Sequence, residues 1–437
     1  MSDWNFKELK KWDEKICEIA LSHNLDWYPI IYETCDYYEM IGHMSYHGMP
    51  SHYPHWSFGK TFERTHQMYN MGMEGLPYEL IINSDPSIAY LMRENPLYLQ
   101  ILIMAHCTGH SDFFKNNRMF ADTDPKHVVS RFRNARKRIQ GYIEDPSIGI
   151  EKIEAILDAC HTIQHQTYRY PRDYINHKDQ KNNLIKKAKK LREKGKSIDH
   201  IDFEKIPLSP EHDILGFLGE HARMLEEWQK DIIEIVRDEA RYFIPQMRTK
   251  VMNEGWASFW HYNIMHELDL PQKYHIPFLK SHNQVIRPHI GSINPYHLGF
   301  YLFQKIKERY GIEECFLARE INNDDSFIRQ YLTQEDCEEL NLFSYSLHKD
   351  KFMVDDVSDK EGWKNIKRDL ISQVGANTIP TIYVESIDQG SLLVLHHEHD
   401  GRDLEIEYAE RVIESIVEIW GGQVKLLTVI EGEPFEI

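Results

Sequence analysis

Residues 96–116 read PLYLQILIMAHCTGHSDFFKN, a long apolar segment that opens at Asn95-Pro96. We predict that this segment is a helix, because its apolar and histidine residues recur at steps of three and four. The recurring residues are Leu99, Leu102, Ile103, His106, His110 and Phe113. His106 and His110 are one helical turn apart on the same buried face, which is the spacing that binds a zinc-like ion through two imidazoles.

Two imidazoles on one buried face need polar partners, because burying a polar group without one costs a few kcal/mol. A shared metal ion satisfies both rings at once. The alternative is that His106 and His110 are core histidines, each satisfied by its own hydrogen bonds. We interpret the pair as metal ligands, and the alternative stays open at the level of sequence.

Residues 245–268 form a second predicted helix, and its apolar part, KVMNEGWASFWHYNIMHEL (250–268), carries Glu254. A carboxylate in such a helix is expected to be paired, protonated or bound to a metal. The run Asn253 to Ala257 is similar to the helix that supplies the third ligand in zinc proteases with a glutamate ligand. We therefore predict a zincin-like helix pair with His106, His110 and Glu254 as metal ligands. The alternative for Glu254 is a buried ion pair with an arginine such as Arg169 or Arg172.

The predicted cofactor is a divalent metal, with zinc as the hypothesis. In zinc proteases the catalytic glutamate directly follows the first histidine, but Cys107 occupies that position here. Without that carboxylate nothing in the motif activates a bound water. Candidate replacements are Asp112, Glu39 and His261, which the sequence does not rank. No other cofactor-binding motif is found.

Two further histidine pairs have the same spacing, His43/His47 and His161/His165. We expect His161 and His165 to be hydrogen-bonded residues on a helix face, with an outer-shell role at the metal site as the alternative. The irregular segment 41–60 holds four histidines and either lines a pocket or forms a surface loop.

Composition limits the class of protein. The chain has 437 residues, 41% of them hydrophobic, and no uninterrupted apolar stretch approaches the ~20 residues that a membrane-spanning helix needs. Its 51 basic and 69 acidic residues give a net charge of −18, which disfavours nucleic acid as a partner. The N-terminus lacks the apolar core of a signal peptide, so we expect a cytoplasmic protein without membrane insertion.

We predict an α+β fold with a large, mainly helical N-terminal domain and a small C-terminal domain. Residues 1–305 form the histidine-rich core domain, in which 3–40 are expected to be helical and the polar stretch 177–206 to be a mobile insert. Residues 306–375 are a mixed α/β connector. Residues 376–437 show two strands joined by a turn, a helix that ends at Gly421-Gly422 and a last strand, which predicts a ββαβ unit.

Seven blocks of the sequence resemble the stage V sporulation protein R family, in order along nearly the whole chain. They are HWSFGK (55–60), GLPYELIINSDPSIAYLM (75–92), AHCTGHSDFFKNN (105–117), TYRYPRD (167–173), NEGWASFWHY (253–262), NPYHLG (294–299) and REINNDDSFIRQYL (319–332). The resemblance implies a role in sporulation and formation of the spore cortex, a peptidoglycan layer. It also implies a serine protein kinase and a von Willebrand-type protein as partners, in stress or envelope control.

The resemblance transfers no catalytic residues, because the family's H-x-x-G-H form, matched by His106, Gly109 and His110, also lacks the zincin glutamate. Two hypotheses follow. The first is a metal-binding protein with hydrolase activity on a peptide or a peptidoglycan precursor. The second is a non-catalytic scaffold or regulator that acts with the kinase.

Overall fold

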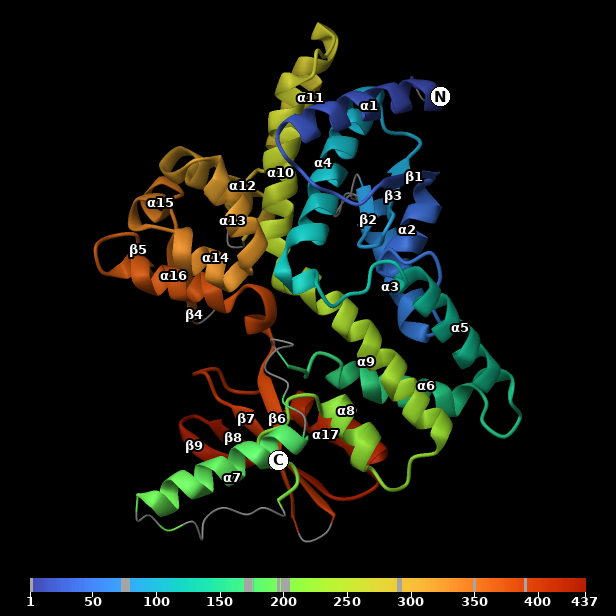
Figure 1. Ribbon diagram of the computed structural model, residues 1–437, viewed down its shortest axis with the longest axis vertical. Helices are drawn as coiled ribbons and strands as arrows, with labels where there is room; N and C mark the ends of the chain where they lie inside the picture. Colours follow the sequence, from blue (N-terminus) through green and yellow to red (C-terminus); the bar gives the residue numbers. More distant parts are fainter. Residues whose placement is uncertain are drawn as a thin grey trace. The chain divides into compact units, whose positions relative to one another are not determined.

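Figure 1 shows the computed structural model of the chain. It describes residues 3–71, 79–168, 175, 177–194, 197, 205–288, 293–348, 351–388 and 391–437. The chain divides into two compact units. Unit 1 comprises residues 1–136 and 243–378, and unit 2 comprises residues 137–242 and 379–437. The three predicted domains, with boundaries after residues 305 and 375, remain a prediction, because the two units describe packing and not independent folding.

The elements up to residue 248 are α1 (Phe6–Ser22), β1 (Ile30–Cys35), α2 (Tyr37–Ser45), α3 (Trp56–Asn70), β2 (Glu79–Ile82), β3 (Ser87–Met92), α4 (Leu97–Asn116), α5 (Val128–Glu144), α6 (Ile150–Ile163), α7 (His177–Glu193), α8 (Ile214–His221) and α9 (Glu227–Arg248). The later elements are α10 (Lys250–Glu267), α11 (Gln272–Val285), α12 (Pro295–Tyr310), α13 (Ile312–Ile321), α14 (Asp324–Tyr331), α15 (Gln334–Glu339), β4 (Phe343–His348), β5 (Lys351–Val357), α16 (Gly362–Ser372), β6 (Thr381–Asp388), β7 (Leu392–Glu398), α17 (Ile406–Trp420), β8 (Val424–Ile430) and β9 (Glu433–Glu436).

Helices α4 and α10 pack side by side in the core of unit 1 (Figure 1). Both predicted helices are confirmed. Seventeen of the 20 residues of α4 are buried, and so are 13 of the 18 residues of α10. Helices buried on most sides must satisfy their polar side chains within the protein. None of the helices in the described ranges has both the length and the apolar character needed to cross a membrane.

Small residues allow the core helices of unit 1 to approach closely. A Cβ atom added to Gly109 of α4 would lie 2.8 Å from the Cα atom of Ala257 in α10. A Cβ atom on Gly255 of α10 would lie 2.4 Å from the backbone of Gly299 in α12. Larger side chains at these crossings would push the helices apart, so the small residues keep the polar side chains of α4 and α10 within contact distance.

A three-stranded sheet lies next to α4 in unit 1, in the order β1-β3-β2. Strand β1 pairs parallel to β3, and β2 pairs antiparallel to β3 with Glu79 opposite Leu91. The prediction that residues 3–40 are helical is wrong for residues 23–36, and the chain becomes helical again at Tyr37, where α2 begins. Residues Ile30–Cys35 form a strand, in which partly buried and exposed side chains alternate, because their register with β3 buries one face of the segment.

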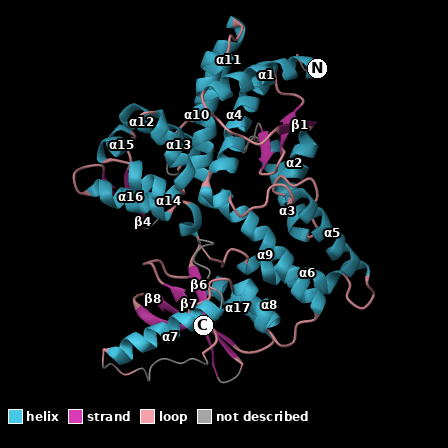
Figure 2. Ribbon diagram, in the orientation of Figure 1, coloured by secondary structure: helices cyan, strands magenta, loops and turns pink. Residues whose placement is uncertain are grey.

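Unit 2 contains a four-stranded sheet in the order β6-β7-β8-β9 (Figure 2). Strands β6 and β7 form an antiparallel hairpin, α17 crosses over, and β8 returns parallel to β7. The ββαβ unit is confirmed, and β9 extends it. Gly421 follows α17 with a φ of +69°, the left-handed conformation that glycine adopts at low cost. The predicted α+β class, mainly helical with a small C-terminal sheet, is therefore correct.

The predicted polar insert, residues 177–206, begins with helix α7. Residues 195–196 and 198–204 of this insert lie outside the described residues.

Candidate metal centre

Four side chains from three elements bring their donor atoms together in unit 1. Nε2 of His110 lies 3.3 Å from Oε2 of Glu254, and Nε2 of His106 lies 3.7 Å from the same oxygen. Oε1 of Glu79, in β2, lies 3.5 Å from Nε2 of His106. The donor atoms of Glu79, His106 and His110 all lie within 4.8 Å of one another, a group that could hold a metal ion.

These separations match the edges of a coordination tetrahedron. Zinc binds imidazole nitrogen and carboxylate oxygen at about 2.1 Å, which places neighbouring donors about 3.4 Å apart. Nε2 of His106 and Oε2 of Glu254 are buried, and neither has a hydrogen-bond partner among the described residues. Two buried polar atoms that face each other at 3.7 Å are too far apart for a hydrogen bond, and a cation between them would satisfy both.

The hydrogen bonds behind the two imidazoles favour ligand geometry. Nδ1 of His110 lies 2.9 Å from Oδ1 of Asn253. Because that oxygen only accepts, Nδ1 carries a proton, and in the neutral ring that binds a metal Nε2 keeps its lone pair for the donor cluster.

His106 is held by a chain of two further histidines. Its Nδ1 lies 2.9 Å from Nδ1 of His261, whose Nε2 lies 2.8 Å from Nδ1 of His282. When His106 donates to His261 and His261 to His282, Nε2 of His106 presents a lone pair to Glu79 and Glu254. The reverse direction puts a proton on Nε2, with its nearest carboxylate oxygens 3.5 and 3.7 Å away, beyond normal hydrogen-bond length.

The charge of Glu254 is stabilised by its neighbours. Burial alone would raise the pKa of this carboxyl, but the positive charge of Lys250, together with that of His110 when its ring is protonated in the metal-free protein, holds its pKa well below the usual range. Lys250 binds Oε1 of Glu254, which leaves Oε2 directed at the two imidazoles. Burial and the neighbouring imidazoles lower the pKa of His261 far below its usual value, so this ring stays neutral.

One face of α10 supplies four of these polar side chains. Five residues of α10 recur at the three- and four-residue steps of a helix and therefore point in one direction, toward α4. They are Lys250, Asn253, Glu254, Ala257 and His261. Ala257 provides the close helix contact, and the four polar residues contact the two histidines of α4 or one another.

The family model described as "SpoVR like protein" matches residues 3–379. The chain belongs to the SpoVR-like protein family. A protein of Escherichia coli (strain K12) that carries the name "Uncharacterized protein YcgB" is 34% identical to this SpoVR-like chain over 476 aligned positions, which cover 97% of the chain and 92% of the relative. No solved structure matches the chain. The family resemblance seen in the sequence is thus confirmed.

The three predicted ligands of this SpoVR-like chain, His106, His110 and Glu254, lie together. Of the candidate bases, His261 lies behind His106, where it contacts Nδ1 and not the ligand nitrogen. Asp112 is fully buried on the opposite side of α4, where its carboxylate accepts from Trp256 Nε1 and from the backbone N–H of Asp26. Glu39 caps α2 and pairs with Arg93 at a half-exposed position.

Sequence reasoning missed Glu79, Asn253 and Lys250. Glu79 is an acidic residue in the otherwise apolar strand ELII, a pattern that should have marked it as a functional candidate. Lys250 is the i−4 neighbour of Glu254 and forms an ion pair with it, for which an arginine was the expected partner. Arg169 and Arg172 lie outside the described residues.

The remaining histidine pairs of the SpoVR-like chain make other contacts. His43 stacks on Tyr90 with a centroid distance of 3.9 Å, and burial lowers its pKa. His47 lies against the ring of Phe243. His161 and His165 belong to unit 2, whereas the four donors belong to unit 1, and burial lowers the pKa of His165.

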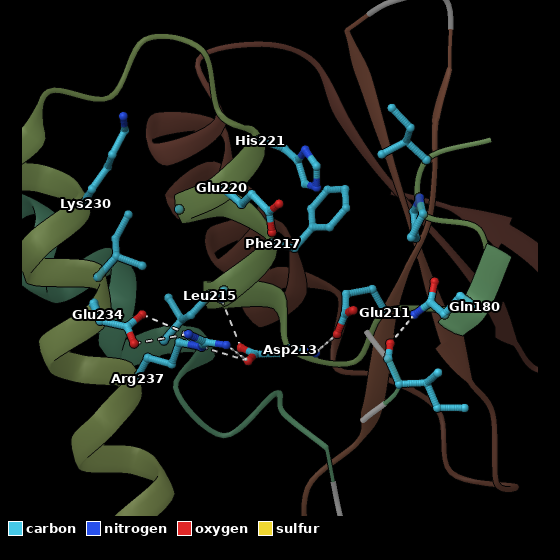
Figure 3. Close-up of a pocket in the computed structure, with 16 residues that line it drawn as sticks. Gln180, Glu211, Asp213, Leu215, Phe217, Glu220, His221, Lys230, Glu234 and Arg237 are labelled. Carbon is cyan, nitrogen blue, oxygen red and sulfur yellow. Dashed lines mark hydrogen bonds and ion pairs between the residues drawn. The ribbon is translucent and has the colours of Figure 1, made fainter. Parts of the chain in front are cut away.

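Unit 2 contains a cavity of about 420 Å³ between α8, α9 and α7 (Figure 3). Arg237 lines this cavity, and its guanidinium lies between Glu234 and Asp213 and forms ion pairs with both (Figure 3). Asp213 is buried and also caps α8 through the backbone N–H of Gly216. These charges therefore neutralise one another and stabilise the packing of α8 on α9.

Proposed function

We propose that this SpoVR-like protein binds one divalent metal ion, with zinc as the first choice, through His106, His110 and Glu254. The observation that carries the proposal is the pair of buried atoms without hydrogen-bond partners, Nε2 of His106 and Oε2 of Glu254, which face each other 3.7 Å apart. Leaving both atoms desolvated and unpaired costs free energy that ion binding would recover.

The chemistry of the donors supports the choice of metal. Two imidazole nitrogens and carboxylate oxygen form the set that zinc accepts in tetrahedral sites. Asn253 and His261 contact the outer nitrogens of the two imidazoles, and Lys250 contacts the outer oxygen of Glu254. Outer partners of this kind orient metal ligands.

Metal analysis of purified protein tests the proposal. We expect about one zinc ion per chain in the wild type and a large loss in His106→Ala and Glu254→Gln. His127→Ala is the matched control, because His127 is an exposed residue that pairs with Asp124 at the surface. Equal, near-zero metal in the wild type and in His106→Ala after growth with added zinc would refute the proposal.

Hydrolysis of a peptide or a peptidoglycan precursor would also require a group that activates a metal-bound water. Cys107, at the position of the zincin glutamate, is fully buried, and burial raises the pKa of its thiol well above the usual value. Asp112 and Glu39 make their contacts with other groups, as described above. A peptide-hydrolysis assay with zinc-loaded protein tests this activity, and loss of activity in His106→Ala would tie it to the centre.

Family membership supports a role in sporulation and formation of the spore cortex, performed in the cytoplasm together with a serine protein kinase. The test is a spore-forming host in which the corresponding gene is deleted. Complementation by the wild type and not by His106→Ala would connect the metal centre to the cortex. Equal complementation by both variants would favour a scaffold whose histidines are structural.

A further inference from the structure

We infer that Glu79 is the fourth ligand of the metal ion and closes its coordination shell. The inference rests on the proposed metal site and assigns the group that completes it. Glu79 is the first residue of β2, so it approaches the two histidines from the sheet, whereas Glu254 approaches them from α10.

The contacts of Glu79 favour a bound cation. Its side chain is only 14% exposed, and in the described part of the chain its carboxylate has an ion-pair contact with His106, while Lys250 acts on it through its charge from farther away. A mostly buried carboxylate is expected to be paired, protonated or metal-bound. The 3.5 Å contact with Nε2 of His106 exceeds normal hydrogen-bond length, and the same nitrogen faces Glu254 at 3.7 Å. One imidazole proton cannot serve both carboxylates, whereas one cation can.

The distance from Glu79 to His106 distinguishes a metal ligand from a general base. A base acts on a water bound to the ion, so its oxygen lies one hydrogen bond beyond the ligand shell. The 3.5 Å between Glu79 and His106 instead equals a ligand-to-ligand edge, since the two edges that Glu254 makes measure 3.3 and 3.7 Å. The distance therefore fits a ligand beside His106 and His110, whose donor atoms lie within 4.8 Å of that of Glu79.

The net charge of the donor set is consistent with this assignment. Two neutral imidazoles and two carboxylates carry a charge of −2, which a divalent cation balances. Four protein ligands leave no open position, and closed shells are typical of structural zinc sites. The ion would then join β2 to α4 and α10, so its role in this state is to hold three segments together that are far apart in the sequence.

Zinc affinity of three full-length variants tests the inference by competition with a chromophoric chelator. Glu79→Gln removes the anionic ligand, and Glu79→Asp keeps the charge but shortens the side chain by one methylene. Glu33→Gln, at an exposed position of β1 in the same sheet, is the control. We expect the Kd for zinc to rise at least ~100-fold in Glu79→Gln, more than loss of an outer-shell partner costs, and to rise clearly in Glu79→Asp, with no change in Glu33→Gln.

Cobalt as a spectroscopic probe gives a second readout that does not depend on affinity. We expect the strong visible absorption of tetrahedral Co²⁺ in the wild type and a weaker, shifted spectrum in Glu79→Gln, as water enters the vacated position. Wild-type affinity and spectrum in Glu79→Gln would overturn the inference while leaving the three-ligand site intact. Wild-type affinity in Glu79→Asp with a loss only in Glu79→Gln would also overturn it, because the carboxylate would then act through its charge. A wild type that binds no zinc would instead refute the proposed function.

Discussion

Nδ1 of His106 and Nδ1 of His261 lie 2.9 Å apart, although 155 residues separate them in the sequence. The contact joins the two central helices of unit 1 and continues to His282 in α11. It therefore directs the opposite nitrogen of His106 toward Glu79 and Glu254, and His261 is a positioning residue for the proposed metal ligand.

We predict that His261→Phe lowers zinc affinity by about 10- to 100-fold, the usual cost of losing an outer-shell partner. Phenylalanine fills the buried space but cannot accept the Nδ1 proton of His106. The measurement is competition with a chelator, and thermal unfolding of the zinc-free protein reports any separate loss of packing. His266→Phe, on the same helix, is the control, since His266 is exposed and bonds to the carbonyl of Tyr262. Equal affinities in the two variants would show that His261 does not orient the ligand.

We predict that Gly109→Ala destabilises the protein by about 1–3 kcal/mol, the range for overpacked cores. The added methyl group would lie 2.8 Å from the backbone of Ala257, which cannot move aside as a flexible side chain would. Gly141→Ala in α5 is the control, because no atom lies within 4 Å of its added Cβ, and alanine is the better helix former there. Urea unfolding measures both changes. A Gly109→Ala variant as stable as Gly141→Ala would mean that α4 and α10 are not held at this separation.

We predict that Asp324→Asn changes how stability depends on pH. Burial raises the pKa of Asp324 to about 7, although its carboxylate accepts the backbone N–H groups of Val251 and Met252 at the start of α10. The folded pKa thus exceeds the unfolded value of about 3.9, so the folded state binds more protons between these values. Wild-type stability should therefore fall as pH rises from about 4 to about 7.

Denaturant unfolding at several pH values from 4 to 8 checks this prediction. Asparagine presents the same acceptor oxygen but does not titrate, so this part of the pH dependence should be absent in Asp324→Asn. Asp325→Asn is the control, because Asp325 pairs with Arg329 at the surface. Parallel profiles for the wild type and Asp324→Asn would contradict the assignment of the slope to Asp324.

We predict that Asp213→Asn destabilises unit 2 by about 3 kcal/mol, because Arg237 and Arg241 both lose their buried counter-charge and Arg237 keeps only the half-exposed Glu234. The buried Asp213 carboxylate accepts from both Arg237 and Arg241. Asparagine can still cap α8, so the change isolates the loss of charge. Asp238→Asn is the control, since Asp238 is half-exposed, and its effect should stay within about 0.5 kcal/mol. Thermal unfolding monitors both variants, and equal melting temperatures would refute the prediction.

The part of the site that could be predicted from sequence is the part determined by helix periodicity. His106 and His110 repeat at one turn of α4, and Glu254 stands in an apolar helix, so each signal lies within one element. Glu79 could not be placed in this way, because its position near His106 depends on how β2 packs beside α4. The same limit applies to Ile30–Cys35, whose strand conformation is stabilised by pairing with β3, more than 50 residues later.

One face of α10 carries five side chains of this cluster: Lys250, Asn253, Glu254, Ala257 and His261. Their directions depend on the number of residues between them as well as on which residues they are. In an α-helix, each successive side chain is rotated by about 100° around the helix axis. Inserting or deleting a single residue between 254 and 261 would rotate His261 away from its imidazole partner while every side chain remained present. Evolution can therefore exchange individual residues of this segment more easily than it can change the number of residues within it.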